Sequence, residues 1–171
     1  MIDSESQNRI EKSRGSMAIL LATWFGSGRL PKAPGTWGSL AALPFAWTLH
    51  AYSSWPLLAL ATISVFVLGV WASCGYLARL GGDDPGPVVI DEVAGMWMTL
   101  IPAAYLSPYT PDIVTYGVGF ILFRIADIFK PWPASWADRT IHGGLGIMLD
   151  DIIAAVFSAL GLTLFIIYLG G

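Results

Sequence analysis

Hydrophobic positions in this chain fall into long blocks separated by short polar stretches. Five apolar blocks cover residues 39–52, 57–80, 93–106, 113–129 and 146–169. The stretches between them are rich in Gly, Pro and Ser, as is typical of turns. A helix needs about 20 apolar residues to cross a bilayer, and blocks 57–80 and 146–169 meet that length alone. The pattern predicts an all-α, polytopic helical membrane bundle with about five crossings.

The shorter blocks make the number of full crossings less definite. Blocks 39–52 and 93–106 suit tilted or partly re-entrant helices, or a thin bilayer. A run of apolar residues at 17–25 is too short to span, so we expect an N-terminal interfacial helix there. Before it, residues 1–16 form a polar stretch. We therefore predict a cytoplasmic tail, 1–16, and a single membrane-embedded domain, 17–171.

Composition supports lipid rather than water as the solvent. The 171 residues are 55% hydrophobic and 12% charged, whereas soluble domains carry about 25% charged residues. The net charge of −3 and the lack of a basic stripe argue against nucleic-acid binding. The single cysteine, Cys74, cannot form an internal disulfide, and we expect it to pack in the core.

Charge then predicts which ends of the helices face the cytoplasm. With alternating connections, all nine Lys and Arg fall on one side, and the connections at 53–56 and 107–111 contain none. Basic residues in short loops stay cytoplasmic, so the N-terminus is predicted inside and the C-terminus outside. Among the acids, only Asp112 is expected outside. Eight others crowd the cytoplasmic ends: Asp83, Asp84, Asp91, Glu92, Asp127, Asp138, Asp150 and Asp151. Chemistry is therefore expected at this face.

Paired acids are the strongest chemical signal. Asp150 and Asp151 lie about one turn into an apolar helix, where each charge is costly and the two repel. A divalent cation would relieve both penalties. Asp91 and Glu92 open another apolar block, where the alternative to a cation site is a favourable interaction with the helix dipole.

A second signal is the triplet of Arg124, Asp127 and Lys130, spaced every three residues on one predicted helix face. The functional interpretation is a cation-binding carboxylate flanked by two phosphate-binding cations. The alternative is an interfacial face that neutralises itself while its long side chains reach toward water.

The first loop has the features of an anion site. Its glycines permit close backbone approach, and Thr36 or Ser39 is expected to cap the helix that follows. A helix N-terminus favours an anion, so Lys32, Thr36 and Ser39 are candidates for binding substrate phosphate. The alternative is a simple capped turn.

These residue types together indicate metal-assisted phosphoryl chemistry. Oxygen ligands suit Mg²⁺, with Mn²⁺ an alternative. The candidate metal ligands are Asp91, Glu92, Asp127, Asp150 and Asp151. Arg124, Lys130 and Arg139 are expected to hold phosphate. His142 is a candidate proton donor, the alternative being a solvated loop histidine, and His50 is expected near the far side.

Four stretches also resemble a known family. Residues 32–39, 91–97, 124–133 and 138–152, in this order and spacing, resemble phosphatidylglycerophosphatase A. The resemblance implies a Mg²⁺-dependent hydrolase of the bacterial inner membrane. It would act on a phospholipid in the bilayer, converting phosphatidylglycerophosphate to phosphatidylglycerol and inorganic phosphate on the route to cardiolipin.

Several alternatives stay open at this point. No Asp-x-Asp-x-Thr, cysteine-nucleophile or Ser-Gly-His pattern occurs, which favours attack by metal-activated water over a covalent route through Asp127 or Asp150. A cation transporter using intramembrane acids is the main rival, and it requires access from both sides. A structural scaffold would not need paired acids beside basic residues. An alcohol-phosphate transferase is disfavoured because its Asp-Gly-x-x-Ala-Arg pattern is missing.

Overall fold

A computed structural model describes residues 4–82 and 85–168; for residues 4–11 and Arg14 it describes the backbone alone. Asp3, Asp83 and Asp84, and the last residue of the fifth apolar block, lie outside the described residues. The described chain is helical and contains no strand, which confirms the all-α prediction. Its elements are α1 (Ser4–Ala22), the 3-10 helix η1 (Ser27–Arg29), α2 (Pro34–Leu80), α3 (Ile90–Leu106), α4 (Ile113–Phe129), α5 (Ala134–Thr140) and α6 (Gly143–Tyr168).

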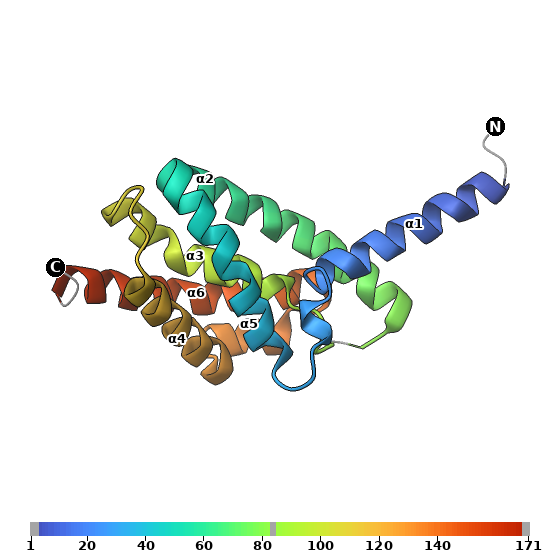
Figure 1. Cartoon of the computed structure of the whole chain (residues 1–171). Coiled ribbons are helices and arrows are strands. Elements are labelled where there is room, and N and C mark those ends of the chain that lie inside the picture. The colour runs from blue at the N-terminus through green and yellow to red at the C-terminus, as the bar shows by residue number, and fades with distance from the viewer. Residues whose placement is uncertain (1–3, 83–84, 169–171) are drawn as a thin grey trace.

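Helix α2 is folded back on itself at Ser54. This residue has φ 59° and ψ −158°, far from helical values, so the 47-residue element consists of two arms (Figure 1). A straight helix of that length would measure about 70 Å, more than twice the thickness of the hydrocarbon core of a bilayer. The Ser54 hydroxyl donates to the carbonyl of Ala104 at 2.7 Å, which ties the bend to α3. The bend falls within the predicted break at 53–56.

Different helix ends and connections lie at the two ends of the bundle (Figure 1). The bend of α2, the α3–α4 connection and the end of α6 lie at one end. The loop before α2, the start of α3 and the start of α6 lie toward the other. The sides assigned from charge stay a prediction.

Helix α3 provides much of the packed core. Val93, Met96 and Leu100 are completely buried. Gly95 lets another helix approach closely, because a Cβ there would lie 2.5 Å from the ring of Phe123 on α4. Small residues at such contacts are typical of packing between membrane helices.

The outer surface is apolar, as expected for a protein in lipid. Leu60, Ile63 and Val67 on α2 and Leu164 on α6 are all more than half exposed. In the described chain, α2 and α6 are long and apolar enough to cross a membrane. Helices α3 and α4 have 17 residues each and fall below that length. The chain is a membrane protein, and the number of its crossings is taken up below.

Three local predictions were wrong. Helix α2 begins at Pro34 with Ala33 at its N-cap, so neither Thr36 nor Ser39 caps it. Proline suits the first turn because the N–H that it lacks would have no helical partner there. Helix α5 lies between blocks 113–129 and 146–169, in a stretch where we predicted turns. Cys74 is exposed on α2 rather than packed in the core, because the buried face of this arm runs through Gly69, Ala72 and Tyr76.

The N-terminal helix is longer than expected. We predicted helix at 17–25, after a tail ending at residue 16; α1 instead begins at Ser4, passes through Ser16 without a break and ends at Ala22. The chain then turns, with Trp24 and Phe25 in left-handed conformations. The division into tail and membrane domain stays a prediction.

Polar residues at the far end have structural partners. His50 is buried, with Nδ1 3.2 Å from the hydroxyl of Tyr116 and Nε2 2.8 Å from the carbonyl of Ser107. Asp112 caps α4 by accepting from the backbone N–H of Val114 at 2.9 Å and of Thr115 at 3.0 Å. Slight burial alone would raise the pKa of Asp112, but the hydrogen bonds from Thr115 and Val114 outweigh it and lower the pKa.

Candidate active site

Three acids from two helices meet at the end of the bundle predicted to be cytoplasmic. Asp91 and Glu92 lie in the first turn of α3, and Asp151 lies about two turns into α6. One carboxylate oxygen from each lies within 4.8 Å of the others. Asp127 of α4 lies beside Asp151 and adds a fourth carboxylate. The acids that were paired only in sequence thus form one cluster.

Several oxygens of this cluster are buried without a hydrogen-bond partner. They include Oε2 of Glu92 and Oδ2 of Asp151. A buried polar atom left unpaired costs about 1–3 kcal/mol, and more if it is charged. Hard cations such as Mg²⁺ take oxygen ligands of this kind and would satisfy these atoms. The donor set therefore fits a divalent cation.

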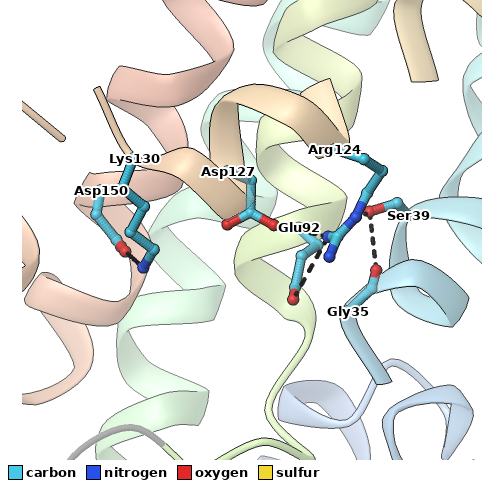
Figure 2. A network of polar contacts seen from close by, with 7 residues as sticks. All are labelled: Gly35, Ser39, Glu92, Arg124, Asp127, Lys130 and Asp150. Carbon is cyan, nitrogen blue, oxygen red and sulfur yellow. Dashed lines mark hydrogen bonds and ion pairs between the residues drawn. The ribbon is translucent and has the colours of Figure 1, made fainter. Parts of the chain in front are cut away.

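Arg124 of α4 joins the acids to α2. Its Nη1 lies 2.7 Å from Oδ2 of Asp127 and 3.9 Å from Oε1 of Glu92, and it donates to the hydroxyl of Ser39 at 3.3 Å (Figure 2). Its Nε is buried and has no hydrogen-bond partner. A buried guanidinium donor is thus available beside unpaired carboxylate oxygens.

The start of α2 comes unusually close to this group. The Ser39 hydroxyl donates to the carbonyl of Gly35 at 2.9 Å. A Cβ at Gly35 would lie 2.1 Å from Oε1 of Glu92 and 3.0 Å from Nη1 of Arg124. Residue 35 must therefore be glycine for this approach, in agreement with the role predicted for the glycines of the first loop.

Lys130 forms the second basic contact and lies just outside its helix. It follows the end of α4 with φ 42°, a left-handed conformation that takes its side chain out of line with Arg124 and Asp127. Its Nζ lies 3.0 Å from Oδ1 of Asp138 and pairs with Asp150 (Figure 2). Lys130 therefore does not lie on the predicted helix face, but it lines the same cleft as Arg124 and Asp127.

The ion pairs of Lys130 affect its protonation. Partial burial alone would lower the pKa of Lys130, but the hydrogen bond and charge of Asp150, with the hydrogen bond of Asp138, raise it above the ordinary value. Lys130 is therefore a fixed cation at neutral pH. Asp138 was not among the predicted site residues, although it opens one of the family-like stretches.

These side chains surround a cleft of about 320 Å³. Four carboxylates and the two cations Arg124 and Lys130 line it, an excess of two formal negative charges that one divalent cation would balance. The lining residues are Ala33, Pro34, Gly35, Gly86, Val88, Asp91, Glu92, Arg124, Asp127, Ile128, Lys130 and Asp151.

A second cavity of about 250 Å³ adjoins the Lys130 pair. Asp138, Arg139, His142 and Asp150 line it, together with backbone at the start of α6. Asp150 is buried, pairs with Lys130 through one oxygen and has no hydrogen-bond partner at the other. It thus lies between the two cavities.

The predicted site residues fall into two groups, one around the cleft and one away from it. The structure brings Asp91, Glu92, Asp127, Asp151, Arg124 and Lys130 together around the cleft, with Ser39 next to them. Arg139 and His142 are exposed around the second cavity instead. Thr36 is half-buried in the first turn of α2, and Lys32 is exposed on the loop before it.

The chain was compared with known proteins. Residues 20–166 match the model of the family described as phosphatidylglycerophosphatase A. A protein of that name from Escherichia coli (strain K12) is 44% identical over 92% of this chain and 89% of its own length. Another of that name, from Haemophilus influenzae, is 37% identical over 82% of this chain and 83% of its own length.

A third relative has a different name. A Bacteroides thetaiotaomicron protein, named provisionally as a phosphatidylinositol-3-phosphatase, is 36% identical over 83% of this chain and 89% of its own length. No solved structure matches the chain.

Proposed function

Because the chain belongs to the phosphatidylglycerophosphatase A family, we propose that the cleft lined by Glu92, Arg124 and Asp151 is its active site. The enzyme is a lipid phosphatase of phosphatidylglycerol synthesis, and it hydrolyses phosphatidylglycerophosphate to phosphatidylglycerol and inorganic phosphate. One observation carries the assignment of the site. In one cleft, buried carboxylate oxygens of Glu92 and Asp151 and the buried Nε of Arg124 have no hydrogen-bond partner. A metal ion would bind the carboxylate oxygens, and a phosphate would accept the hydrogen bond from Nε.

We assign the metal to the acidic side of the cleft. Asp91, Glu92 and Asp151 would hold a Mg²⁺ ion, with Asp127 beside them. When bound, the ion would neutralise phosphate charge and make a water molecule more acidic. A phosphate would otherwise enter a cleft with an excess of negative charge.

Arg124 would bind and orient the phosphate. Its guanidinium is held by Asp127 and Ser39, so its planar donors are fixed before substrate arrives. Lys130 would contribute charge from the other wall, where Asp138 and Asp150 hold it. Phosphate binding by three further residues stays a prediction, because none of them lines the cleft. They are Lys32 on the loop before α2, Thr36 in the first turn of α2 and Arg139 at the second cavity.

The reaction exchanges one P–O bond for another. Water forms a bond to phosphorus, the bond to the glycerol oxygen breaks, and the departing alkoxide takes up a proton. Asp127 lies in the cleft and is the candidate to accept the proton of water. His142 is exposed beside Asp150 in the adjoining cavity and is the candidate to protonate the leaving oxygen. A covalent route through Asp127 or Asp150 is the alternative.

Topology follows from the same arrangement. We propose five crossings, formed by the two arms of α2 and by α3, α4 and α6, with the cleft on the cytoplasmic face of the bacterial inner membrane. The short α3 and α4 would need tilt or local thinning of the bilayer. The clustering of acids at one end favours this over a cation transporter, which needs access from both sides.

The experiment is phosphate release by the purified protein in detergent micelles. We expect phosphatidylglycerophosphate to be hydrolysed when Mg²⁺ is present and a chelator to abolish release. Phosphatidic acid and phosphatidylinositol 3-phosphate should be tested in parallel, because one relative has a name that points to the latter. Metal-independent release would contradict the role proposed for the acids.

A further inference from the structure

An apolar groove runs along the outside of the bundle between the first arm of α2 and α4. Its volume is about 460 Å³. Leu40, Leu43, Pro44 and Trp47 line one wall, and Ile113, Tyr116, Gly117 and Phe120 line the other. Both sets have the spacing of a single helical stripe, so the groove follows the two helices lengthwise.

The groove leads directly to the proposed active site. On α2, Leu40 follows Ser39, and on α4, Phe120 lies one turn before Arg124. Ser39 and Arg124 are hydrogen bonded to each other and Arg124 lines the cleft, so the head of the groove adjoins the cleft. From Arg124 to Ile113 the helix rises about 16 Å, close to the depth of one leaflet in a hydrocarbon core about 30 Å thick.

We propose that this groove seats one acyl chain of the phospholipid whose phosphate lies in the cleft. The inference rests on the proposed function and adds to it how the lipid is held. Its walls are apolar from Leu40 to Trp47, and the packed rings of Trp47 and Tyr116, 5.0 Å apart, give it a rigid boundary. Since the surrounding lipid is as apolar as the groove, the contact contributes orientation rather than hydrophobic burial.

Gly117 keeps the groove open. A Cβ built on this residue meets nothing within 4 Å, whereas the next glycine of α4, Gly119, packs against Leu100 and Leu162. A Cβ at position 117 therefore meets no packed neighbour, and a larger side chain there would extend into the groove that Gly117 lines. Glycine is also a poor helix former, so replacing it costs the helix nothing.

The test is Gly117→Phe, with Ile121→Phe as the matched control. Ile121 is 57% exposed on the same helix and is not among the residues that line the groove. For long-chain phosphatidylglycerophosphate we expect Gly117→Phe to lower kcat/KM roughly tenfold through poorer positioning, and Ile121→Phe to leave it unchanged. For the deacylated head group, both variants should match the wild type.

The outcomes separate this inference from the function itself. Equal losses with the long-chain and deacylated substrates, or a normal rate for Gly117→Phe with the long-chain lipid, would overturn the acyl-chain site and leave the phosphatase intact. No hydrolysis of either substrate by folded wild type would instead remove the proposed function.

A second measurement locates the acyl chain of the lipid directly. Phosphatidylglycerophosphate with a photoreactive diazirine in its acyl chains should label Leu40, Leu43 or Phe120, and unlabelled substrate should suppress the labelling. Labelling confined to the groove between α4 and α6, around Leu122 and Phe157, would overturn the proposal.

Discussion

One guanidinium nitrogen of Arg124, Nη1, contacts the carboxylate of Asp127 at 2.7 Å and also donates to the hydroxyl of Ser39, 85 positions earlier in the chain. Arg124 thus joins the start of α2 to Asp127 of α4, and it lies 3.9 Å from Oε1 of Glu92 on α3.

Arg124→Lys should therefore inactivate the enzyme without unfolding it. A lysine keeps the charge but offers a single nitrogen, whereas Arg124 contacts Asp127 and Ser39 through Nη1 and still has a buried Nε donor free for phosphate. We expect kcat to fall on the order of a hundredfold, the usual cost of losing an oriented donor at a reacting group. Arg29→Lys, at an exposed position of η1, is the control and should retain wild-type kinetics. Equal activity of the two variants would contradict the role of Arg124.

Gly35→Ala should displace Glu92. The added Cβ would lie 2.1 Å from Oε1 of Glu92, so either the carboxylate or the start of α2 must move. We expect a higher Mg²⁺ concentration for half-maximal phosphate release and a lower maximal rate. Gly161→Ala is the matched control, because its Cβ would make ordinary contacts with Leu122 at 3.4–3.7 Å. An unchanged Mg²⁺ requirement in Gly35→Ala would show that Glu92 does not help to hold the ion.

Lys130 and Asp150 should behave as an energetically coupled pair. Removal of either partner leaves the other partly buried charge without its main contact. In a double-mutant cycle with Lys130→Met and Asp150→Asn, unfolding in detergent should give a coupling free energy of about 0.5–3 kcal/mol. The pair Lys130→Met and Asp112→Ala, at opposite ends of the bundle, should be additive within about 0.5 kcal/mol. Additivity in the first cycle would contradict the predicted coupling between Lys130 and Asp150.

Asp112→Ala should lower stability by about 1 kcal/mol, the usual cost of losing an N-cap, and leave catalysis intact. The pKa of Asp112 is lower in the folded protein than its ordinary value. Its stabilising effect is therefore complete above the ordinary pKa of aspartate and is lost as the pH falls through the lower, folded-state pKa. Thermal unfolding of the two proteins should differ at neutral pH and converge in acid; a constant difference would contradict the capping role.

The sequence was sufficient to predict the helical class, because it depends on local patterns, and its resemblance to a known family was sufficient to predict a lipid phosphatase. Apolar blocks mark the helices, and charges within them mark the candidate site. Asp150 and Asp151 could be recognised as costly in an apolar helix without knowing what they face. The pairing of Ser39 with Arg124 could not be predicted, since it depends on how α2 packs beside α4.

Backbone detail was also beyond the sequence pattern. The left-handed conformation of Lys130 redirects its side chain from the face of Asp127 toward Asp138 and Asp150. The equal spacing of Arg124, Asp127 and Lys130 suggested that one helix carries all three residues. In the structure α4 ends at Phe129, so Lys130 lies beyond the helix. Helix α5 was missed because its seven residues are too few to show a hydrophobic period.

The most direct test of the metal site is phosphate release from phosphatidylglycerophosphate by Asp151→Asn, measured across Mg²⁺ concentrations beside wild type and Asp112→Asn. Wild type and Asp112→Asn should need Mg²⁺ equally and lose activity in chelator. Asp151→Asn should remain folded and lose at least roughly a hundredfold in rate at every Mg²⁺ concentration, because a ligand of the ion and a fixed charge are removed together. A rate for Asp151→Asn equal to that of wild type, with the same Mg²⁺ requirement, would contradict the claim that the carboxylate cluster of α3 and α6 holds the ion.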